Sequence, residues 1–369
     1  MEMKKYKLGD LLTIKNGCDH KKLKDGKYPV YGSGGIMRYV DSYLYDKESV
    51  LLPRKGTLSN IQYACEPFWT VDTIYYTELK SDLVNAYYLY RYLSLLDLSG
   101  LDSGTGVPSM TFDAYYNISV SLPPLPTQQK IAAVLSSLDK KIALNSRINA
   151  RLEQMAKRLY EHYFVQFDFP TADGKPYKTS GGKMVYSSEL KREIPEGWEV
   201  KRLGELNVVS RGTTITQKQT TKGNIKVVAG GLTYSYTNGE SNRRKNCITV
   251  SGSGENAGFV NFWREPIFAS DCSTVQFEDD FDTIICYFNL KMHEHIFFRN
   301  SHKSAQPHVY PSDIKEIPFV IPPKEVKEKI KDLFLKANDK IAILQQESAR
   351  LTSLRDRLLP LLMNGQVSV

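Results

Sequence analysis

The sequence lacks the patterns that mark several classes of protein. Its five cysteines are odd in number and form no Cys-x-x-Cys pair, which argues against a disulfide framework and predicts reduced thiols. The first residues, MEMKKYKLGDLL, contain no apolar signal-peptide core, and no apolar run approaches the roughly 20 residues that span a bilayer. These absences exclude the disulfide-rich and membrane-spanning classes and predict a cytoplasmic globular protein.

Basic and acidic residues are nearly balanced over most of the chain. The net charge is +8, yet residues 1–126 hold 14 basic and 14 acidic side chains, and residues 197–323 hold 14 and 13. Most of the excess lies in residues 127–170 and 324–369, which carry +3 each. Net charge therefore does not argue for a nucleic-acid partner, and only local basic clusters can do so.

No constellation of catalytic residues is present either. Gly252-x-Gly254-x-x-Ala257 has the spacing of a dinucleotide fingerprint, but it leads into a strand pattern where a helix should begin. His293 and His295, expected on one face of a strand, are too few to form a metal site. The aspartates of FEDDFD resemble a solvated turn, and the Glu-x-Lys of SSELK lies in a stretch without strand pattern. The sequence thus predicts a protein that is not an enzyme.

What the chain does contain is an internal duplication. ISVSLPPLPTQQKIAAVLSSLDKKIAL, ending at Leu144, returns as IPFVIPPKEVKEKIKDLFLKANDKIAI, ending at Ile343, at a constant offset of 199 residues. Upstream, LGDL (Leu8–Leu11) matches LGEL (Leu203–Leu206) at an offset of 195, so the preceding regions have gained residues in loops. Runs rich in Val, Ile, Tyr and Thr, such as TVDTIYYTEL, predict that those regions are β-rich.

The repeated segments predict two long helices that pair. Apolar residues recur every three or four positions from Gln128 to about Phe164, without internal Pro or Gly, as in a coiled-coil seam. Pro360 should end or kink the second helix. The alternative is two unrelated amphipathic helices, each lying on its own domain. The predicted seam residues are Ile131, Leu135, Leu138, Ile142, Leu152, Leu159, Ile330, Phe334, Ile341, Leu344, Leu351 and Leu358.

The predicted fold class is α+β, internally duplicated, with two β-rich domains separated by two long antiparallel coiled-coil helices in pseudo-two-fold symmetry. An irregular connector with aromatic residues at both ends joins the halves. The predicted parts are a first β-rich domain (1–126), a first spacer helix (127–168), the connector (169–196), a second β-rich domain (197–323) and a second spacer helix (324–369).

Polar, glycine-flanked loops with basic clusters occupy matching places in the two β-rich domains. Such loops suit close approach to phosphates and base edges, although solvated surface loops are the simpler alternative. The loops lie at matching places in the two domains but differ in sequence, so we expect each domain to recognise a different DNA sequence. Arg54, Arg243 and Arg244 are expected to contact guanine bases or phosphates. The candidate DNA-binding residues are Lys21, Lys22, Ser33, Arg54, Lys55, Thr57, Asn60, Lys218, Tyr234, Arg243, Arg244, Lys245, Ser253, Glu255, Asn256 and Gln306.

Taken together, these segments resemble the specificity subunits of Type I restriction–modification systems. The resemblance rests on YKLGDLLTIKNG, PPLPTQQKIAAVLSSLDKKI, YFVQFDFP and EIPEGWEVKRLG around the connector, and LRDRLLPLLMNGQ. It departs from the family's helix-start pattern at Thr127, where an acidic residue is common, so partner contacts there do not transfer.

The resemblance implies two target-recognition domains that read a bipartite DNA target, one half-site each. It implies assembly with two methyltransferase and two restriction/translocase subunits, and no membrane association. No cofactor is expected on this chain; S-adenosylmethionine, ATP and Mg are expected on the partner subunits. The alternatives are an enzyme with its own methyltransferase or nuclease site, and a coiled-coil scaffold that does not read DNA.

Overall fold

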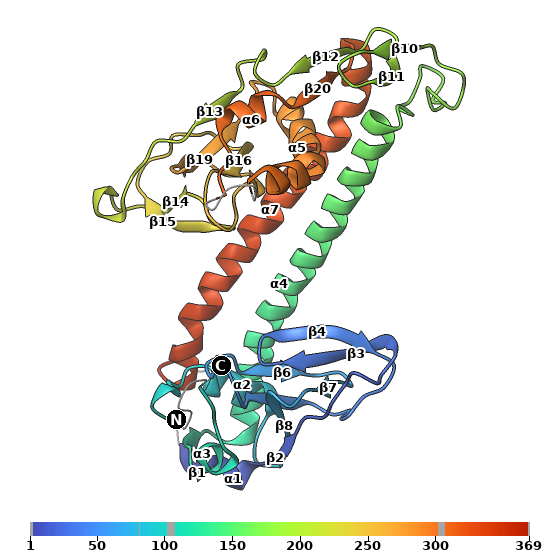
Figure 1. The fold of residues 1–369 in the computed structure, drawn as a ribbon. Helices are drawn as coiled ribbons and strands as arrows, with labels where there is room; N and C mark the ends of the chain where they lie inside the picture. The colour runs from blue at the N-terminus through green and yellow to red at the C-terminus, as the bar shows by residue number, and fades with distance from the viewer. Residues whose placement is uncertain (1–2, 81, 102–107, 302–306, 368–369) are drawn as a thin grey trace. The chain divides into compact units, whose positions relative to one another are not determined.

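The computed structural model describes residues 3–80, 82–101, 108–301 and 307–367. The chain divides into two compact units, and each joins one β-rich domain to parts of two long helices (Figure 1). The first unit comprises Met1–Leu144 and Ser348–Val369, and the second comprises Asn145–Glu347.

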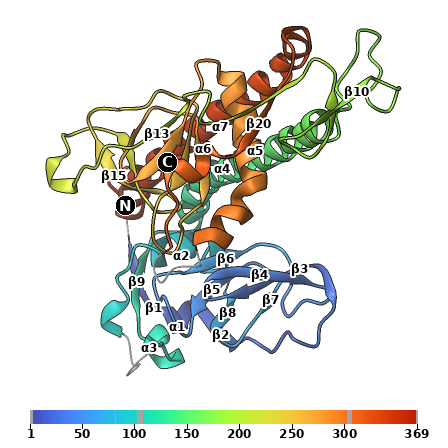
Figure 2. The ribbon, with the colours of Figure 1, turned by 45° about the horizontal axis from the view of Figure 1, so that its top comes forward.

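The first β-rich domain consists of two small sheets and a strand pair that joins its ends. Strand β1 (Lys4–Lys7) pairs antiparallel with β9 (Ser119–Leu122). One sheet has the order β2-β8-β5-β6, and the other has the order β4-β3-β7, in which β3 and β7 are parallel (Figure 2). Their bounds are β2 (Leu12–Asn16), β3 (Asp25–Gly32), β4 (Gly35–Val40), β5 (Ser49–Pro53), β6 (Gln62–Ala64), β7 (Trp69–Thr70) and β8 (Ile74–Leu79).

The second β-rich domain repeats this topology strand for strand. Strand β12 (Glu199–Arg202) pairs with β20 (Pro318–Ile321), and the sheets have the orders β13-β19-β16-β17 and β15-β14-β18, with β14 and β18 parallel. The central strands β5 and β16 are buried along their whole length, which explains their continuous apolar runs. The bounds are β13 (Val209–Arg211), β14 (Ile225–Val228), β15 (Tyr234–Asn238), β16 (Cys247–Ser251), β17 (Val260–Trp263), β18 (Ile267–Ala269) and β19 (Cys272–Val275).

Two glycines hold the same tight backbone crossing in both domains. A Cβ atom at Gly17 would lie 2.1 Å from the carbonyl oxygen of Val71, and one at Gly212 would lie 2.1 Å from that of Ser270. Beside them, the N–H of Cys18 donates to Thr70 O at 2.8 Å and that of Thr213 to Ala269 O at 2.9 Å. Only a residue without a side chain fits at either crossing.

Shorter helices complete the domains. Helix α2 follows β8 and is capped by Asn85, whose side chain accepts the N–H of Tyr88. The longer helix α5 follows β19 at the corresponding place in the second domain. The helical segments are α1 (Leu8–Leu11), α2 (Ala86–Leu93), η1 (Ser99–Leu101), α3 (Phe112–Tyr116), η3 (Gln217–Gln219), α5 (Asp280–Ser301) and α6 (Pro311–Lys315).

The two long helices, α4 (Leu125–Tyr160) and α7 (Lys324–Met363), begin directly after the two Pro-Pro pairs. The backbone N–H of Gln128 donates to Pro124 O at 3.1 Å, and that of Lys327 donates to Pro323 O at 3.0 Å. The two helix starts therefore have the same backbone geometry at corresponding positions. A five-residue π-helical turn, η2 (Glu161–Val165), extends α4.

Within each unit, one helix packs its start against the end of the other. In the first unit, Leu135 of α4 and Leu362 of α7 belong to one hydrophobic core. In the second, the ring centroids of Phe164, in the π turn, and Phe334 of α7 lie 6.4 Å apart. The helices are therefore antiparallel and packed together. The predicted class of two β-rich domains with two long packed helices is confirmed.

The residues predicted to form the seam are buried to different degrees. The fully buried ones are Ile131, Leu135, Ile330, Phe334, Ile341 and Leu344, and the half-buried ones are Leu138, Ile142, Leu152, Leu159, Leu351 and Leu358. The middle of the seam carries a polar contact, in which the side-chain amide of Asn145 donates to the carboxylate of Glu347 at 2.8 Å.

Three local predictions were wrong. The segment MHEHIFF is part of α5 rather than a strand. The first half of this helix, residues 281–290, is buried on nearly all faces, so the helix has no clear amphipathic period and its aromatic and β-branched content imitates a strand. The acidic FEDDFD segment is not a free turn: Asp279 accepts the N–H of Phe281 at the start of α5. The connector is not wholly irregular, since it folds a hairpin of β10 (Met184–Ser187) and β11 (Arg192–Pro195).

The helix ends also differ from the prediction. Helix α4 begins at Leu125, three residues before Gln128, and holds Pro126 in its first turn, where a proline costs no helical hydrogen bond. Helix α7 runs through Pro360 and ends at Met363. The aromatic ends of the connector do pack as predicted, because Trp198 contacts the rings of Phe167 and Phe169.

Candidate nucleic-acid interface

In the first domain, the loop after β5 is fastened to a segment far along the chain. The N–H of Gly56 donates to Pro108 O at 2.9 Å, and the N–H of Met110 donates to Arg54 O at 3.0 Å. Gly56 has φ +92°, a left-handed conformation that favours glycine. This backbone turn presents the side chains of Arg54 and Lys55 at the end of a buried strand.

The turn between β3 and β4 joins the same cluster. The side-chain amide of Asn60 donates to Ser33 O at 2.5 Å, and that of Gln62 donates to Gly32 O at 2.8 Å. Three predicted loops, Tyr31–Gly35, Pro53–Asn60 and the described end of 102–109, therefore meet. We call this set the first loop cluster.

The second domain builds the same cluster with different residues. The N–H of Gly254 (φ +80°) donates to Pro307 O at 3.2 Å, and the N–H of Val309 donates to Gly252 O at 3.0 Å. The hydroxyl of Ser251 donates to Gly230 O at 2.6 Å, which brings in the segment between β14 and β15. This second loop cluster has the backbone frame of the first, with Gly252 and Ser253 where the first has Arg54 and Lys55.

The predicted residues of the first domain fall into two groups. Ser33, Arg54, Lys55, Thr57 and Asn60 all lie in the first loop cluster, with Lys55 and Thr57 exposed. The guanidinium of Arg54 is half-buried and donates weakly to Asp72 O at 3.4 Å. Lys21 and Lys22 are exposed on the separate loop between β2 and β3.

The predicted residues of the second domain are more scattered. Ser253, Glu255 and Asn256 lie in the second loop cluster. Lys218 is exposed on η3, and Tyr234 is exposed on β15 with the ammonium of Lys226 5.4 Å from its ring centroid. Lys245 is exposed beside the start of β16. Gln306 lies outside the described residues.

Arg243 and Arg244 are engaged within their own domain. The guanidinium of Arg243 donates to Thr274 Oγ1 at 3.0 Å, Ser210 Oγ at 3.1 Å and the Arg211 carbonyl at 3.0 Å. Arg244 forms an ion pair with Asp280 and also donates to backbone carbonyls. Their donors are thus paired within the second domain, so neither arginine is among the residues proposed to contact DNA.

Sequence reasoning missed apolar side chains beside the first loop cluster. Ile36 and Met37, on β4, are 50% and 59% exposed, and Leu232 before β15 is 51% exposed at the corresponding place. The signal was present in the stretch GSGGIM, where two apolar residues directly follow a glycine turn. Both hairpins therefore expose apolar side chains close to their loop clusters.

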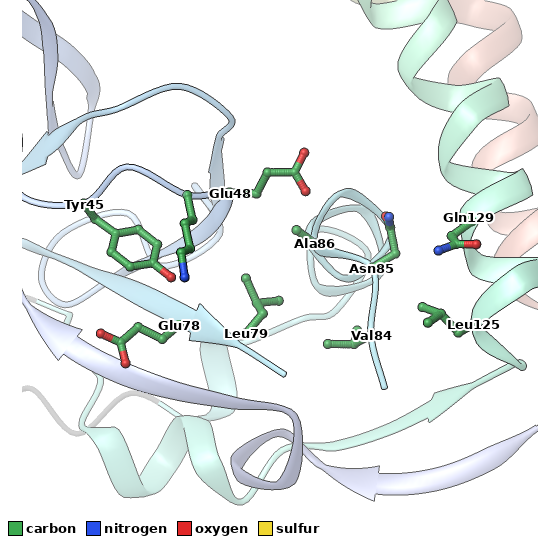
Figure 3. A pocket seen from close by; sticks show the side chains of 10 residues that line it. Tyr45, Glu48, Glu78, Leu79, Val84, Asn85, Ala86, Leu125 and Gln129 are labelled. Carbon is green, nitrogen blue, oxygen red and sulfur yellow. The ribbon is translucent and has the colours of Figure 1, made fainter. Parts of the chain in front are cut away.

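A polar cavity beside the first β-rich domain offers no catalytic arrangement. This cavity of about 670 Å³ lies between the first β-rich domain and the start of α4, with Glu48, Glu78, Asn85 and Gln129 at its walls (Figure 3). Glu48 accepts the hydroxyl of Tyr63 at 2.6 Å, and burial together with this bond raises the pKa of that phenol. The carboxylate of Glu48 is thus engaged by a phenol, and no serine, cysteine or histidine is among the residues that line this cavity.

The described residues contain no group of three or more His, Cys, Asp or Glu that could hold a metal ion. His293 and His295 instead make ring-nitrogen contacts of 2.8 Å with the carbonyls of Asn289 and Met292 on their own helix. In the same part of the chain, no helix is long and apolar enough to cross a membrane. The segment from Gly252 to Ala257 leads into β17 rather than a helix.

Comparison with known families matches this architecture. A family model described as "Type I restriction modification DNA specificity domain" matches residues 1–154 and 195–353, so each match covers one β-rich domain and most of the long helix after it. The chain therefore belongs to this family. It is a DNA specificity subunit of a Type I restriction–modification system, a class of subunit that carries no catalysis.

Particular relatives agree in length and fold. The chain is 25% identical to the Type I restriction enzyme MjaIX specificity subunit of Methanocaldococcus jannaschii, over 88% of this chain and 79% of that protein. It is 24% identical to the HindI specificity subunit of Haemophilus influenzae, over 72% of each. The crystal structure of the S subunit from M. genitalium shares the fold, with a TM-score of 0.68 and 16% identity over 98% of this chain and 96% of that one.

Proposed function

We propose that this subunit reads a bipartite, asymmetric DNA target, with one half-site for each β-rich domain. The observation that carries the proposal is the pair of loop clusters. Their backbone bonds correspond one by one, from Gly56–Pro108 to Gly254–Pro307, while the side chains that they present differ. Two domains that recognise different half-sites need a similar backbone arrangement that presents different side chains to the bases.

The chemistry of the loops supports base and phosphate contacts. Lysines reach phosphates as flexible point charges, whereas arginine, asparagine, serine and threonine recognise base edges by hydrogen bonds. The proposed contact residues are Lys21, Lys22, Ser33, Arg54, Lys55, Thr57 and Asn60 in the first domain, and Lys218, Tyr234, Lys245, Ser253, Glu255 and Asn256 in the second.

The energy scale fits two small readers. Specific sites are bound about 4–10 kcal/mol more tightly than non-specific DNA. At about 1–3 kcal/mol for each good base contact, about four to six contacts are needed, or two to three from each domain. Because each β-rich domain carries almost no net charge, we expect the isolated chain to bind DNA weakly, with the partner subunits supplying most phosphate contacts.

The proposed complex contains two methyltransferase and two restriction/translocase subunits in the cytoplasm, where the DNA lies. S-adenosylmethionine, ATP and Mg would bind to those partners, and the specificity subunit directs them to the target. The parts 1–126, 127–168, 169–196, 197–323 and 324–369 remain the proposed functional divisions of the chain.

Methylome sequencing of the host, with and without this gene, tests the proposal. We expect loss of one two-part methylated motif, and exchange of one β-rich domain should change only one half of that motif. Retention of the whole motif in the deletion strain, in the presence of active partners, would contradict the proposal. It would favour the alternative of a scaffold that does not read DNA.

Substitutions in one loop cluster separate reading from assembly. We expect Lys55→Ala with Thr57→Ala to reduce methylation about tenfold or more, and to relax the sequence requirement in the first half-site only. The exposed connector residue Lys175 supplies the matched control, since Lys175→Ala removes the same charge from a segment that belongs to neither cluster. Equal methylation by the two variants would remove the first loop cluster from the interface.

A further inference from the structure

Each long helix carries, four residues after its Pro-Pro pair, a side chain that fastens it to the β-rich domain before it. In the first unit this residue is Gln128, which is 1% exposed. Its carbonyl oxygen accepts the N–H of Asn85 at 3.0 Å, and its amide donates to Leu83 O at 3.2 Å and Pro123 O at 2.9 Å. Asn85 is the capping residue of α2, and Figure 3 shows it facing the start of α4.

The second unit uses an ion pair at the corresponding place. Lys327 of α7 lies 2.7 Å from Asp279 and 2.8 Å from Asp282, at the start of α5. Its side chain is 20% exposed, and that of Asp282 is 24% exposed. Asp279 holds the same capping place in α5 that Asn85 holds in α2, since it accepts the N–H of Phe281 at 2.8 Å. The corresponding residues of α4 and α7 thus both attach their helix to the preceding β-rich domain, Gln128 by neutral hydrogen bonds and Lys327 by ion pairs.

Lys327 does not stabilise its own helix α7 at this position. A cation in the first turn faces the positive end of the helix dipole, which disfavours it. Burial raises the pKa of the Asp282 carboxyl, and the hydrogen bond and charge of Lys327 act against that shift. The ion pair is therefore a contact between domain and helix that neither element would keep alone.

We propose that residues 128 and 327 are positioning residues that match each recognition domain to its own helix, and that Gln128 and Lys327 are not interchangeable. This inference rests on the proposed function, because it concerns how a recognition domain is seated while it reads DNA. A domain moved onto the other helix loses its matching residue. The second domain on α4 would place Asp279 and Asp282 beside the neutral amide of Gln128. The first domain on α7 would place the backbone groups that Gln128 normally contacts beside the ammonium of Lys327.

A domain exchange tests the matching directly. The ends of both domains are adjacent strands, so residues 199–321 can replace residues 4–122 in the full chain, co-expressed with its methyltransferase partner. This chimera should methylate a symmetric motif that contains the second half-site twice. We expect at least tenfold more methylation when it also carries Gln128→Lys. In the unexchanged chain, Gln128→Lys alone should reduce methylation.

The outcomes separate the two proposals. Equal methylation of the symmetric motif by both chimeras overturns the matching and leaves the proposed function in place. A parent chain that methylates no two-part motif overturns the proposed function. The melting temperatures of variants then test whether residues 128 and 327 match their domains.

A double-mutant cycle measures the matching without DNA. Lys327→Gln and Asp282→Asn should each lower the melting temperature by about 4 °C, whereas the double variant should fall no further than the worse single variant. The exposed pair Lys336–Asp332 on the same helix, with side chains 79% and 65% exposed, is the matched control and should show almost no change. Additive effects of Lys327→Gln and Asp282→Asn would overturn the proposal.

Discussion

The two long helices make their second contact with the recognition domains in unlike ways. Asp139 of α4 and Asn338 of α7 occupy corresponding positions at the offset of 199 residues. The carboxylate of Asp139 pairs with Arg91 of α2 and accepts the hydroxyl of Tyr87, and it also pairs with Arg355 of α7 at 2.9 Å. An anion therefore gathers two cations in the first unit.

In the second unit the corresponding residue is a neutral amide. Asn338 accepts from the guanidinium of Arg264 at 2.9 Å and donates to Asn246 Oδ1 at 3.0 Å. Arg264 obtains its counter-charge elsewhere, from Glu153 of α4 at 3.3 Å. The difference shows that the duplication preserved the length and phase of the helices, while each domain acquired its own polar contacts with them.

Removal of Asp139 should have the largest effect on this comparison. Asp139→Ala leaves Arg91 and Arg355 without their shared anion, with side chains only 11% and 20% exposed. We expect a loss of about 3 kcal/mol in the free energy of unfolding of the first unit, because a partly buried charge loses its partner. Urea denaturation followed by far-UV circular dichroism measures the loss.

The matched change in the second unit is Asn338→Ala. It removes two hydrogen bonds but leaves the Arg264–Glu153 ion pair, so we expect a smaller loss of about 1–2 kcal/mol. If Asp139→Ala and Asn338→Ala lower the free energy of unfolding equally, the difference in charge between the two positions does not affect stability.

Alkaline pH should separate the two units next. Burial raises the pKa of the Cys247 and Cys272 thiols to about 12, from an ordinary value of 9.0, and raises that of Cys286 as well. All three are buried and belong to the second unit, whereas Cys18 and Cys65 of the first are exposed, and only partial burial raises the pKa of Cys65. The folded state keeps its thiol protons while the unfolded state loses them above pH 9. Stability is therefore complete below pH 9 and falls as the pH rises toward 12.

We expect each buried thiol to remove about 1.4 kcal/mol of stability from the second unit by pH 10. Trp198 and Trp263 report this unit by fluorescence once Trp69→Phe has silenced the first. Cys247→Ala with Cys272→Ala should flatten the pH dependence between pH 8 and pH 10. A second unit that is equally stable at both pH values, before those substitutions, would contradict the expectation.

The smallest effect is expected where the strand pairs at the domain ends carry different polar contacts. Arg202 and Glu316 form an ion pair across β12 and the start of β20, with side chains 53% and 66% exposed. At the corresponding place in the first domain, Lys7 Nζ donates to Asn117 Oδ1 at 2.9 Å. We expect Arg202→Ala to cost less than about 1 kcal/mol and the cost to shrink in high salt. Thermal unfolding at two salt concentrations measures both, with Lys7→Ala as the salt-insensitive counterpart.

Most of the architecture could be predicted because the duplication is legible in the sequence. The gapless offset of 199 residues located both Pro-Pro breaks and both helices, and the matching loops located the pieces that form the two clusters. The prediction was good wherever a local pattern and its repeat agreed. It was wrong for α5, whose buried faces leave no amphipathic period to detect.

The remaining features depend on partners that are distant in sequence. Arg243 appears in the sequence as a cation in a polar loop, yet Ser210 and Thr274 take up its donors across the sheet. Lys327 is likewise one lysine among many in its helix, until Asp279 and Asp282 are placed beside it. Hydrogen-bond partners of this kind follow from topology, which a single sequence specifies only through its fold.

The paired glycine crossings have a consequence for how such a subunit can change. At Gly17 and Gly212 any side chain would collide with a backbone oxygen, so no neighbouring side chain can move to relieve the clash. In a deep mutational scan these two positions should tolerate no replacement, while Lys55 and Glu255 tolerate many at the level of folding. Selection can then vary the residues proposed to contact DNA, because intolerance is concentrated at a few backbone contacts outside the two loop clusters.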